Sequence, residues 1–107
     1  MLFKFKSKAA GDLVMLEPTG RRILKIIGKD PSPTGIIQPP EMAAAATALE
    51  RAVAEEEAQQ KAAIEEARAK GEPPPRFEAI SLRQRAHPFI EMLRRCEKAD
   101  REIVWGV

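Results

Sequence analysis

The stretch that decides the fold is Ser81–Val107, which reads SLRQRAHPFIEMLRRCEKADREIVWGV. Ser81 with Gln84 three residues later is a capping-box pattern, which marks the start of a helix. One apolar face follows at helical spacing, made of Leu82, Ala86, Phe89, Leu93 and Cys96. Beyond it, apolar residues alternate from Ile103 to Val107, as in a strand. The stretch therefore predicts an amphipathic helix near 81–97 and then a short strand.

Pro88 lies within this helix and leaves two interpretations open. A proline beyond the first turn removes a backbone hydrogen bond, costs about 3 kcal/mol and bends the helix. The sequence therefore predicts either one helix kinked at Pro88 or a helix proper that starts there, with 82–86 as a separate turn.

The N-terminal residues supply strands for the C-terminal one to pair with. Phe3 and Phe5 alternate with Lys4 and Lys6, which predicts a half-buried strand whose lysines face water. After a small-residue turn comes the apolar run 13–16. We expect it to complete a β-hairpin, with a short helix as the alternative, because the run is too short for its periodicity to decide.

Two more helices are expected in the middle of the chain. Pro18 and Gly28 suit the start and the end of a helix over 18–27, and the prolines at 39–40 open a second helix over 40–57. Residues 58–70 have high helix propensity but few large apolar side chains, so they are either an exposed continuation or a second helix that frays. A loop separates these helices, and Ile36 and Ile37 are expected to return to the core as a short extended piece.

These elements predict a small α+β fold. The hairpin and the C-terminal strand form a three-stranded sheet, covered by helices near 18–27, 40–57 and 81–97. Residues 1–107 form a single domain, in which 54–76 is a solvent-exposed, helical and proline-rich arm whose removal should cost the core little. The expected buried set is Phe3, Phe5, Ile23, Ile27, Leu49, Leu82, Phe89, Leu93 and Trp105.

The composition narrows the class of protein. A single Cys excludes an intramolecular disulfide framework and suits a reducing compartment. No apolar run approaches the roughly 18 residues of a transmembrane helix, and Gly11 with Asp12 interrupts any apolar core of a signal peptide. We therefore expect a cytoplasmic protein that does not bind membranes. A net charge of +2 also argues against a nucleic-acid partner.

Candidate chemistry centres on one helix face. His87 and Glu91 are four residues apart, a spacing that can bring two metal ligands together, but no second His completes a site. The simpler interpretation is that His87 is a cap or a surface partner of Glu91. Cys96 is too far along the same helix to pair with His87 as a nucleophile, so it is expected to be a buried apolar residue. We expect no catalytic residue and no cofactor, and lean towards a protein that is not an enzyme.

Two binding hypotheses remain beside the metal one. Lys4, Lys6, Arg83 and Arg85 would bind a polyanion weakly if the fold gathered them. The alanine-rich helix would self-associate, with Leu49 and Val53 packing across a two-fold axis. The preferred expectation is a non-enzymatic interaction module that forms a homo-oligomer or binds another protein.

Three segments also resemble a known family. The start MLFKFKSKAAGDLVML, the segment RRILKIIGKDPSPTGII, and LRQRAHPFIEML with the final WGV are similar to the domain-of-unknown-function family eighteen-forty, found in small proteins of bacteria, mostly betaproteobacteria. The resemblance covers nearly the whole chain apart from 54–76. It implies no activity, cofactor or site residue.

Overall fold

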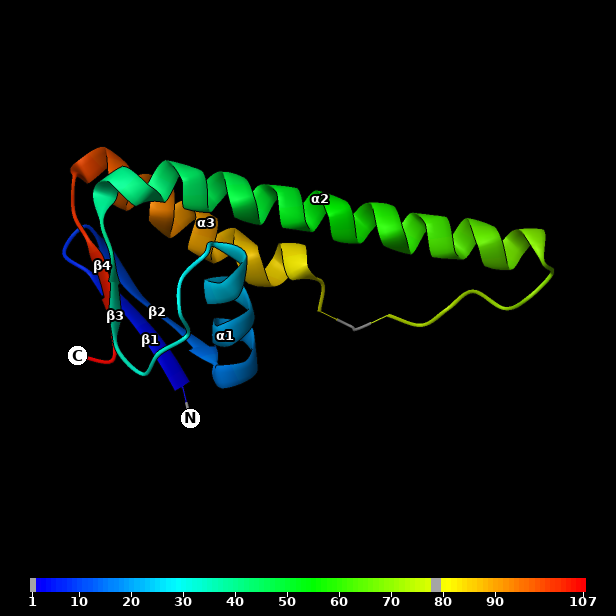
Figure 1. Ribbon diagram of the computed structural model, residues 1–107, viewed down its shortest axis with the longest axis horizontal. Helices are drawn as coiled ribbons and strands as arrows, with labels where there is room; N and C mark the ends of the chain where they lie inside the picture. The colour runs from blue at the N-terminus through cyan, green and yellow to red at the C-terminus, as the bar shows by residue number, and fades with distance from the viewer. Residues whose placement is uncertain (1, 78–79) are drawn as a thin grey trace.

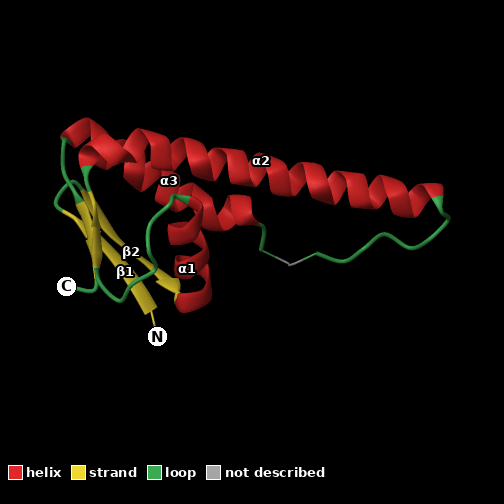
Figure 2. Ribbon diagram, in the orientation of Figure 1, coloured by secondary structure: helices red, strands yellow, loops and turns green. Residues whose placement is uncertain are grey.

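Antiparallel strands form one sheet, and helices cover one of its faces (Figures 1 and 2). The computed structural model describes residues 2–77 and 80–107. In chain order the elements are β1 (Leu2–Ser7), β2 (Ala10–Leu16), α1 (Glu17–Ile26), β3 (Gly35–Ile37), α2 (Pro39–Ala69), α3 (Leu82–Ala99) and β4 (Ile103–Trp105). The predicted α+β class is confirmed, and the three helices described correspond to those expected.

The sheet has four strands, so the prediction of three was wrong by one. Their order is β2-β1-β4-β3, and all neighbours are antiparallel. The additional strand is β3, where Ile36 pairs with Val104 and Ile37 with Ile103. Three residues between Pro33 and Pro39 are too few to show a strand period, and their partner β4 is the last element of the chain. The sequence therefore predicted an extended piece there but not its pairing.

The N-terminal hairpin is confirmed, including the strand at 13–16. In its register Phe3 lies opposite Met15, Lys4 opposite Val14 and Phe5 opposite Leu13. Alternation puts Phe3 and Phe5 on the covered face, where both are buried, and Lys4 on the open face.

The core centres on Phe5, which α3 and β4 contact from two sides. The Phe5 ring meets the Phe89 ring edge-on at 4.8 Å between centroids, and the Trp105 ring lies 5.8 Å away. Such aromatic pairs contribute about 0.5–1.5 kcal/mol each beyond the area they bury. All nine residues expected in the core are buried except Ile27, which is half-buried because it follows the last residue of α1.

Helix α1 packs on the same face as the core through Gly20. A Cβ at Gly20 would lie 2.5 Å from Cδ2 of Phe3, far inside van der Waals contact. The sequence shows Gly20 only as a residue that weakens a helix. In the structure its missing side chain is what lets α1 approach β1.

Helix α2 is continuous from Pro39 to Ala69, so the interpretation of one extended helix holds and that of two helices does not. Its first half is anchored by five buried residues, Met42, Ala45, Ala46, Leu49 and Val53. Helix α3 runs beside this half, whereas the second half projects away from the sheet (Figure 1). The chain then returns along 70–77, where every residue is exposed.

Helix α3 contains Pro88 within its span. It begins at Leu82, after the Ser81 cap, and continues to Ala99, so a helix that starts at Pro88 is excluded. The proline ring lies on an exposed part of the helix, between the buried Ala86 and Phe89. Its missing N–H therefore removes one helical hydrogen bond without disturbing the packed face.

Candidate functional site

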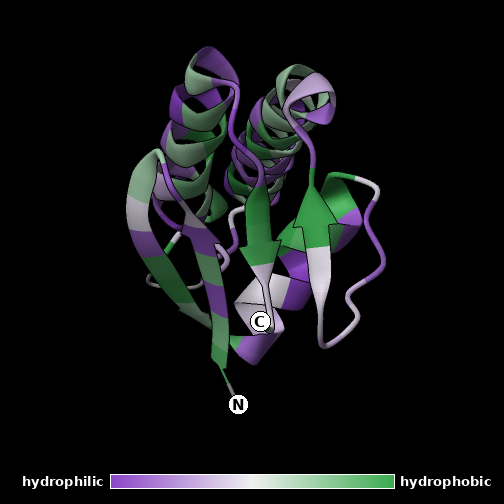
Figure 3. Ribbon diagram, turned by 90° about the vertical axis from the view of Figure 1, so that its left-hand side faces the viewer, coloured by the Kyte–Doolittle hydropathy of each residue, from purple (hydrophilic) through white to green (hydrophobic). Residues whose placement is uncertain are grey.

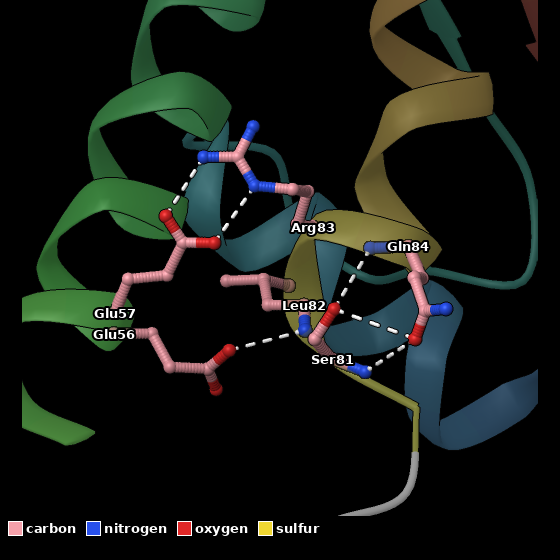
Figure 4. A network of polar contacts seen from close by, with 6 residues as sticks. All are labelled: Glu56, Glu57, Ser81, Leu82, Arg83 and Gln84. Atoms are coloured by element: carbon pink, nitrogen blue, oxygen red, sulfur yellow. Dashed lines mark hydrogen bonds and ion pairs between the residues drawn. The ribbon is translucent and has the colours of Figure 1, made fainter. Parts of the chain in front are cut away.

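The N-terminus of α3 is held by a carboxylate from α2, as Figure 4 shows. Oε2 of Glu56 accepts a hydrogen bond from the backbone N–H of Leu82 at 3.0 Å, while Oε1 accepts one from Nη2 of Arg22 in α1 at 3.0 Å. The predicted capping box is confirmed beside it, since Ser81 and Gln84 exchange hydrogen bonds at 3.2 and 3.1 Å. Glu56 thus joins all three helices, and residues 54–57 of the expected arm contact the core.

Ion pairs continue this contact along α2 and α3. Arg83 donates two hydrogen bonds to Glu57, each 2.7 Å, and further along Arg94 pairs with Glu50. The hydrogen bonds from Arg83 lower the pKa of the Glu57 carboxyl and those to Glu57 raise the pKa of the guanidinium. Both side chains are exposed, so the pair orients the helices more than it stabilises them.

His87 and Glu91 lie together on the outer side of α3. Nε2 of His87 is 3.1 Å from Oε1 of Glu91, and both side chains are about two-thirds exposed. They line a shallow groove of about 430 Å³ between α2 and α3, together with Glu50, Arg83 and Arg94. Among the described residues, no three His, Cys, Asp or Glu side chains gather closely enough to hold a metal ion. The arrangement is the surface pair that the spacing indicates.

The four basic residues considered for polyanion binding are on separate surfaces. Lys4 and Lys6 are on β1, and Lys4 lies 3.7 Å from Asp12. Arg83 faces Glu57 across the helix pair, while Arg85 turns to α1 and donates to Oγ1 of Thr19 at 2.8 Å. The fold therefore does not bring these four cations into one patch.

The surface expected for self-association is occupied within the monomer. Leu49 and Val53, which were to pack across a two-fold axis, are buried in the same core as Leu82 and Phe89. They were misassigned because α3, their true partner, follows about 30 residues later and sequence periodicity does not show which surface an apolar face will meet. Cys96 is also buried in this core, as predicted.

The open face of the sheet carries the most prominent exposed apolar group. The large apolar side chains that are exposed among the described residues are Leu2, Val14, Leu16, Ile36, Phe77, Ile80 and Val107, and the first four share this face. Leu2 lies opposite Leu16 on the neighbouring strand, and Val14 is two residues along. Ile36 pairs with Val104 on the other half of the sheet. The helices cover only the opposite face (Figure 3).

The sequence analysis missed this apolar face although a signal was present. Leu2 has the same strand parity as Lys4, which was placed in water, so Leu2 should have been placed there too. The apolar run at 13–16 hid Val14 and Leu16, since a continuous apolar segment does not reveal which residues face outward. Ile36 was assigned to the core together with Ile37, and only Ile37 is buried.

A second groove runs beside the outer strand of the sheet. It has a volume of about 480 Å³ and lies between the first half of β2, residues 10–13, and the flank of α3. Pro88, Glu91, Met92 and Arg95 are among the α3 residues that line it. Pro88 therefore marks the side of α3 that faces the edge of the sheet.

The fold and these surfaces define a small α+β domain with a covered and an open sheet face. The family described as Domain of unknown function (DUF1840) matches residues 1–105, and the chain belongs to that family, which confirms the resemblance. Searches of curated proteins and of solved structures found no match. Within residues 2–77 and 80–107, no helix is both long enough and apolar enough to cross a membrane.

Proposed function

We propose that this domain is a non-enzymatic protein-interaction module that binds a protein partner on the open face of its sheet. The observation that carries the proposal is the gathering of Leu2, Val14, Leu16 and Ile36 on that face. Single exposed apolar residues are ordinary on a protein surface, whereas a group on one face is typical of an interaction site.

The chemistry of this face indicates the kind of partner. Lys4 and Lys6 lie between the Leu2–Leu16 pair and Val104, and their methylene stems extend the apolar surface while their ammonium groups stay in water. Only one carboxylate, that of Asp12, lies within ion-pair reach of Lys4, at 3.7 Å. An apolar segment bordered by carboxylates is therefore the complementary partner.

In this proposal residues 1–107 act as one domain, and the second half of α2 with its proline-rich return forms an exposed arm. The proposed compartment is the cytoplasm, where the free thiol of Cys96 would stay reduced. The partner would meet the sheet from the side opposite the helices, so neither the arm nor the His87 groove is required for binding.

Site-specific photo-cross-linking in the source cell tests the proposal. A photoreactive residue at Leu2 or Ile36 should capture the same protein, and one at Val107, which is 75 % exposed but lies beyond β4, should not. The captured protein is then purified and its affinity measured by calorimetry. Ile36→Glu should weaken binding at least about tenfold, the usual effect of losing an anchoring residue, and Val107→Glu should leave it unchanged.

Trp105 fluorescence serves as the folding control in this experiment, because the single Trp of the chain is buried against Phe5. If folded Ile36→Glu binds as well as the wild type, or if Leu2 and Ile36 capture nothing that Val107 does not, the open face is not the binding surface.

Polyanion binding through Lys4, Lys6, Arg83 and Arg85 is less well supported. Their cations are spread over the sheet face, the α2–α3 pair and the α1 contact, and Arg83 is bound to Glu57. Retention on heparin that falls steeply with salt and is lost in Lys4→Gln/Lys6→Gln would favour this alternative over the interaction module.

A further inference from the structure

The two edges of the sheet are unequal. On one side β3 has three residues and lies between Pro33 and Pro39, which cannot donate a backbone hydrogen bond. On the other side β2 has seven residues, contains no proline and has Asp12 as its one charged residue. Proteins usually blunt an exposed edge with prolines, lysines or short length, because unpaired N–H and C=O groups offer a template for another strand. The β3 edge is protected in this way and the β2 edge is not.

The flank of α3 beside β2 carries charges of both signs. Glu91 and Arg95 are one helical turn apart and both line the groove next to residues 10–13. The described residues give Arg95 no ion-pair partner, whereas Glu91 contacts His87. When two copies of such a helix meet in antiparallel orientation, Glu91 of each copy lies opposite Arg95 of the other. The flank is therefore complementary to itself.

We propose that a second copy of this chain binds at the β2 edge, so that β2 pairs with β2 around a two-fold axis at Val14. Two antiparallel copies of one strand satisfy each other's free backbone groups, since a two-fold axis perpendicular to the sheet makes the same surface face itself. The four-stranded sheet of each copy continues into the other.

The position of α3 agrees with this arrangement. Phe89 of α3 contacts Phe5 of β1, and Met92 lines the groove at β2, so α3 lies above these two strands. Paired strands are about 4.8 Å apart, so two copies of α3 would flank the seam at a spacing near the roughly 8–10 Å of packed helices. A stable dimer buries about 800 Å² per partner, more than a strand edge alone offers, so the Pro88 groove and the α3 flank belong to the interface.

A second copy fits this edge better than a foreign strand does. A foreign strand would pair with the β2 backbone equally well, but it would leave Glu91 and Arg95 without their counterparts. Pairing at the edge leaves Leu2 and Ile36 exposed on the open face. Dimerisation would double the proposed partner-binding surface, and so it goes beyond the proposed function without depending on it.

Sedimentation of the purified full chain, followed by cross-linking, tests the inference. The wild type should sediment as a dimer at micromolar concentration. Val14→Cys, placed on the axis, should be joined to its copy by a short bifunctional thiol reagent, because directly opposite Cβ atoms are about 5 Å apart. Ile36→Cys, exposed on the same face but on β3, should not be joined, and Cys96 in the wild type is buried.

Charge exchange gives a second readout that does not depend on an introduced thiol. Arg95→Glu should raise the dimer dissociation constant about tenfold, and Glu91→Arg with Arg95→Glu should restore it. A monomeric wild type, cross-linking at Ile36→Cys as strong as at Val14→Cys, or no rescue by the double exchange would each overturn the pairing. A monomer that still binds its partner through Ile36 would refute the pairing alone, whereas a dimer without an open-face partner would refute the proposed function alone.

Discussion

Replacing Glu56 with Ala should destabilise the protein more than any other exposed or half-exposed charge of α2. The change removes the carboxylate that accepts from Leu82 N–H at the N-terminus of α3 and from Arg22 in α1. Loss of a helix cap costs about 0.5–2 kcal/mol, and a surface ion pair is worth about 0.2–1 kcal/mol. The Leu82 N–H is partly buried, so water replaces the lost acceptor incompletely. We expect a loss of about 1–2 kcal/mol in the free energy of unfolding.

Urea unfolding followed by Trp105 fluorescence measures this loss, and a slope of roughly 1.5 kcal/mol per molar would lower the midpoint by about 1 M. Glu56→Gln keeps an acceptor oxygen but no charge, so it should cost about half as much. Glu55→Ala is the matched control, because Glu55 is exposed on the same turn and accepts only from Gln59, at 3.4 Å.

A double-mutant cycle separates the two contacts of Glu56. Arg22→Ala should cost about 0.5 kcal/mol and should lose that effect once Glu56 is Ala, while the Leu82 contribution remains. If Glu56→Ala costs no more than Glu55→Ala, the carboxylate does not hold α3 and the account of Figure 4 is wrong.

Three other predictions follow from the packing, the ion pairs and the exposure of α2. Gly35→Ala should cost about 1–3 kcal/mol by overpacking, measured by thermal unfolding, because its Cβ would lie 2.1 Å from the Trp105 ring, whereas Gly11→Ala has nothing within 4 Å and should be near neutral. The pKa of Glu41 is lowered by the hydrogen bond to Lys29 and then by that from the Gln38 N–H, so its stabilisation is complete above the pKa of an unfolded glutamate and is lost as the pH falls through the folded pKa; the stability gap between wild type and Glu41→Gln should close in acid, and a gap that widens would contradict this. In hydrogen exchange, amides of α2 in 58–69 should exchange at least about tenfold faster than those in 46–57, since only the latter lie under the packed core, and equal protection would show that the projecting half is covered.

Local signals in the sequence were sufficient for most of the elements. The Ser81–Gln84 capping box, the stripe from Leu82 to Cys96 and the alternation of Phe3 and Phe5 each act within a few residues, and each predicted its element correctly. The chain also carried the right α+β class because these periods differ.

Pairings between distant segments could not be read in the same way. The partner of β3 is β4, about 70 residues later, and no residue in 35–37 encodes that contact. Leu49 and Val53 show the same limit, because their apolar face was visible but its partner was not. Glu56 is the clearest case for the candidate site, since one glutamate among three at 55–57 bonds to Leu82 and nothing in the sequence distinguishes it.

The strand order β2-β1-β4-β3 has a consequence for how the chain folds as it is synthesised. The hairpin of β1 and β2 forms from neighbouring residues and needs nothing made later. Strand β3 is made early, but its only neighbour in the sheet is β4, residues 103–105. Until those residues leave the ribosome, β3 and the inner side of β1 have no strand to pair with, and Phe5 lacks its contact with Trp105. The sheet therefore closes from the hairpin outward in one late step, after α2 and α3 have been made.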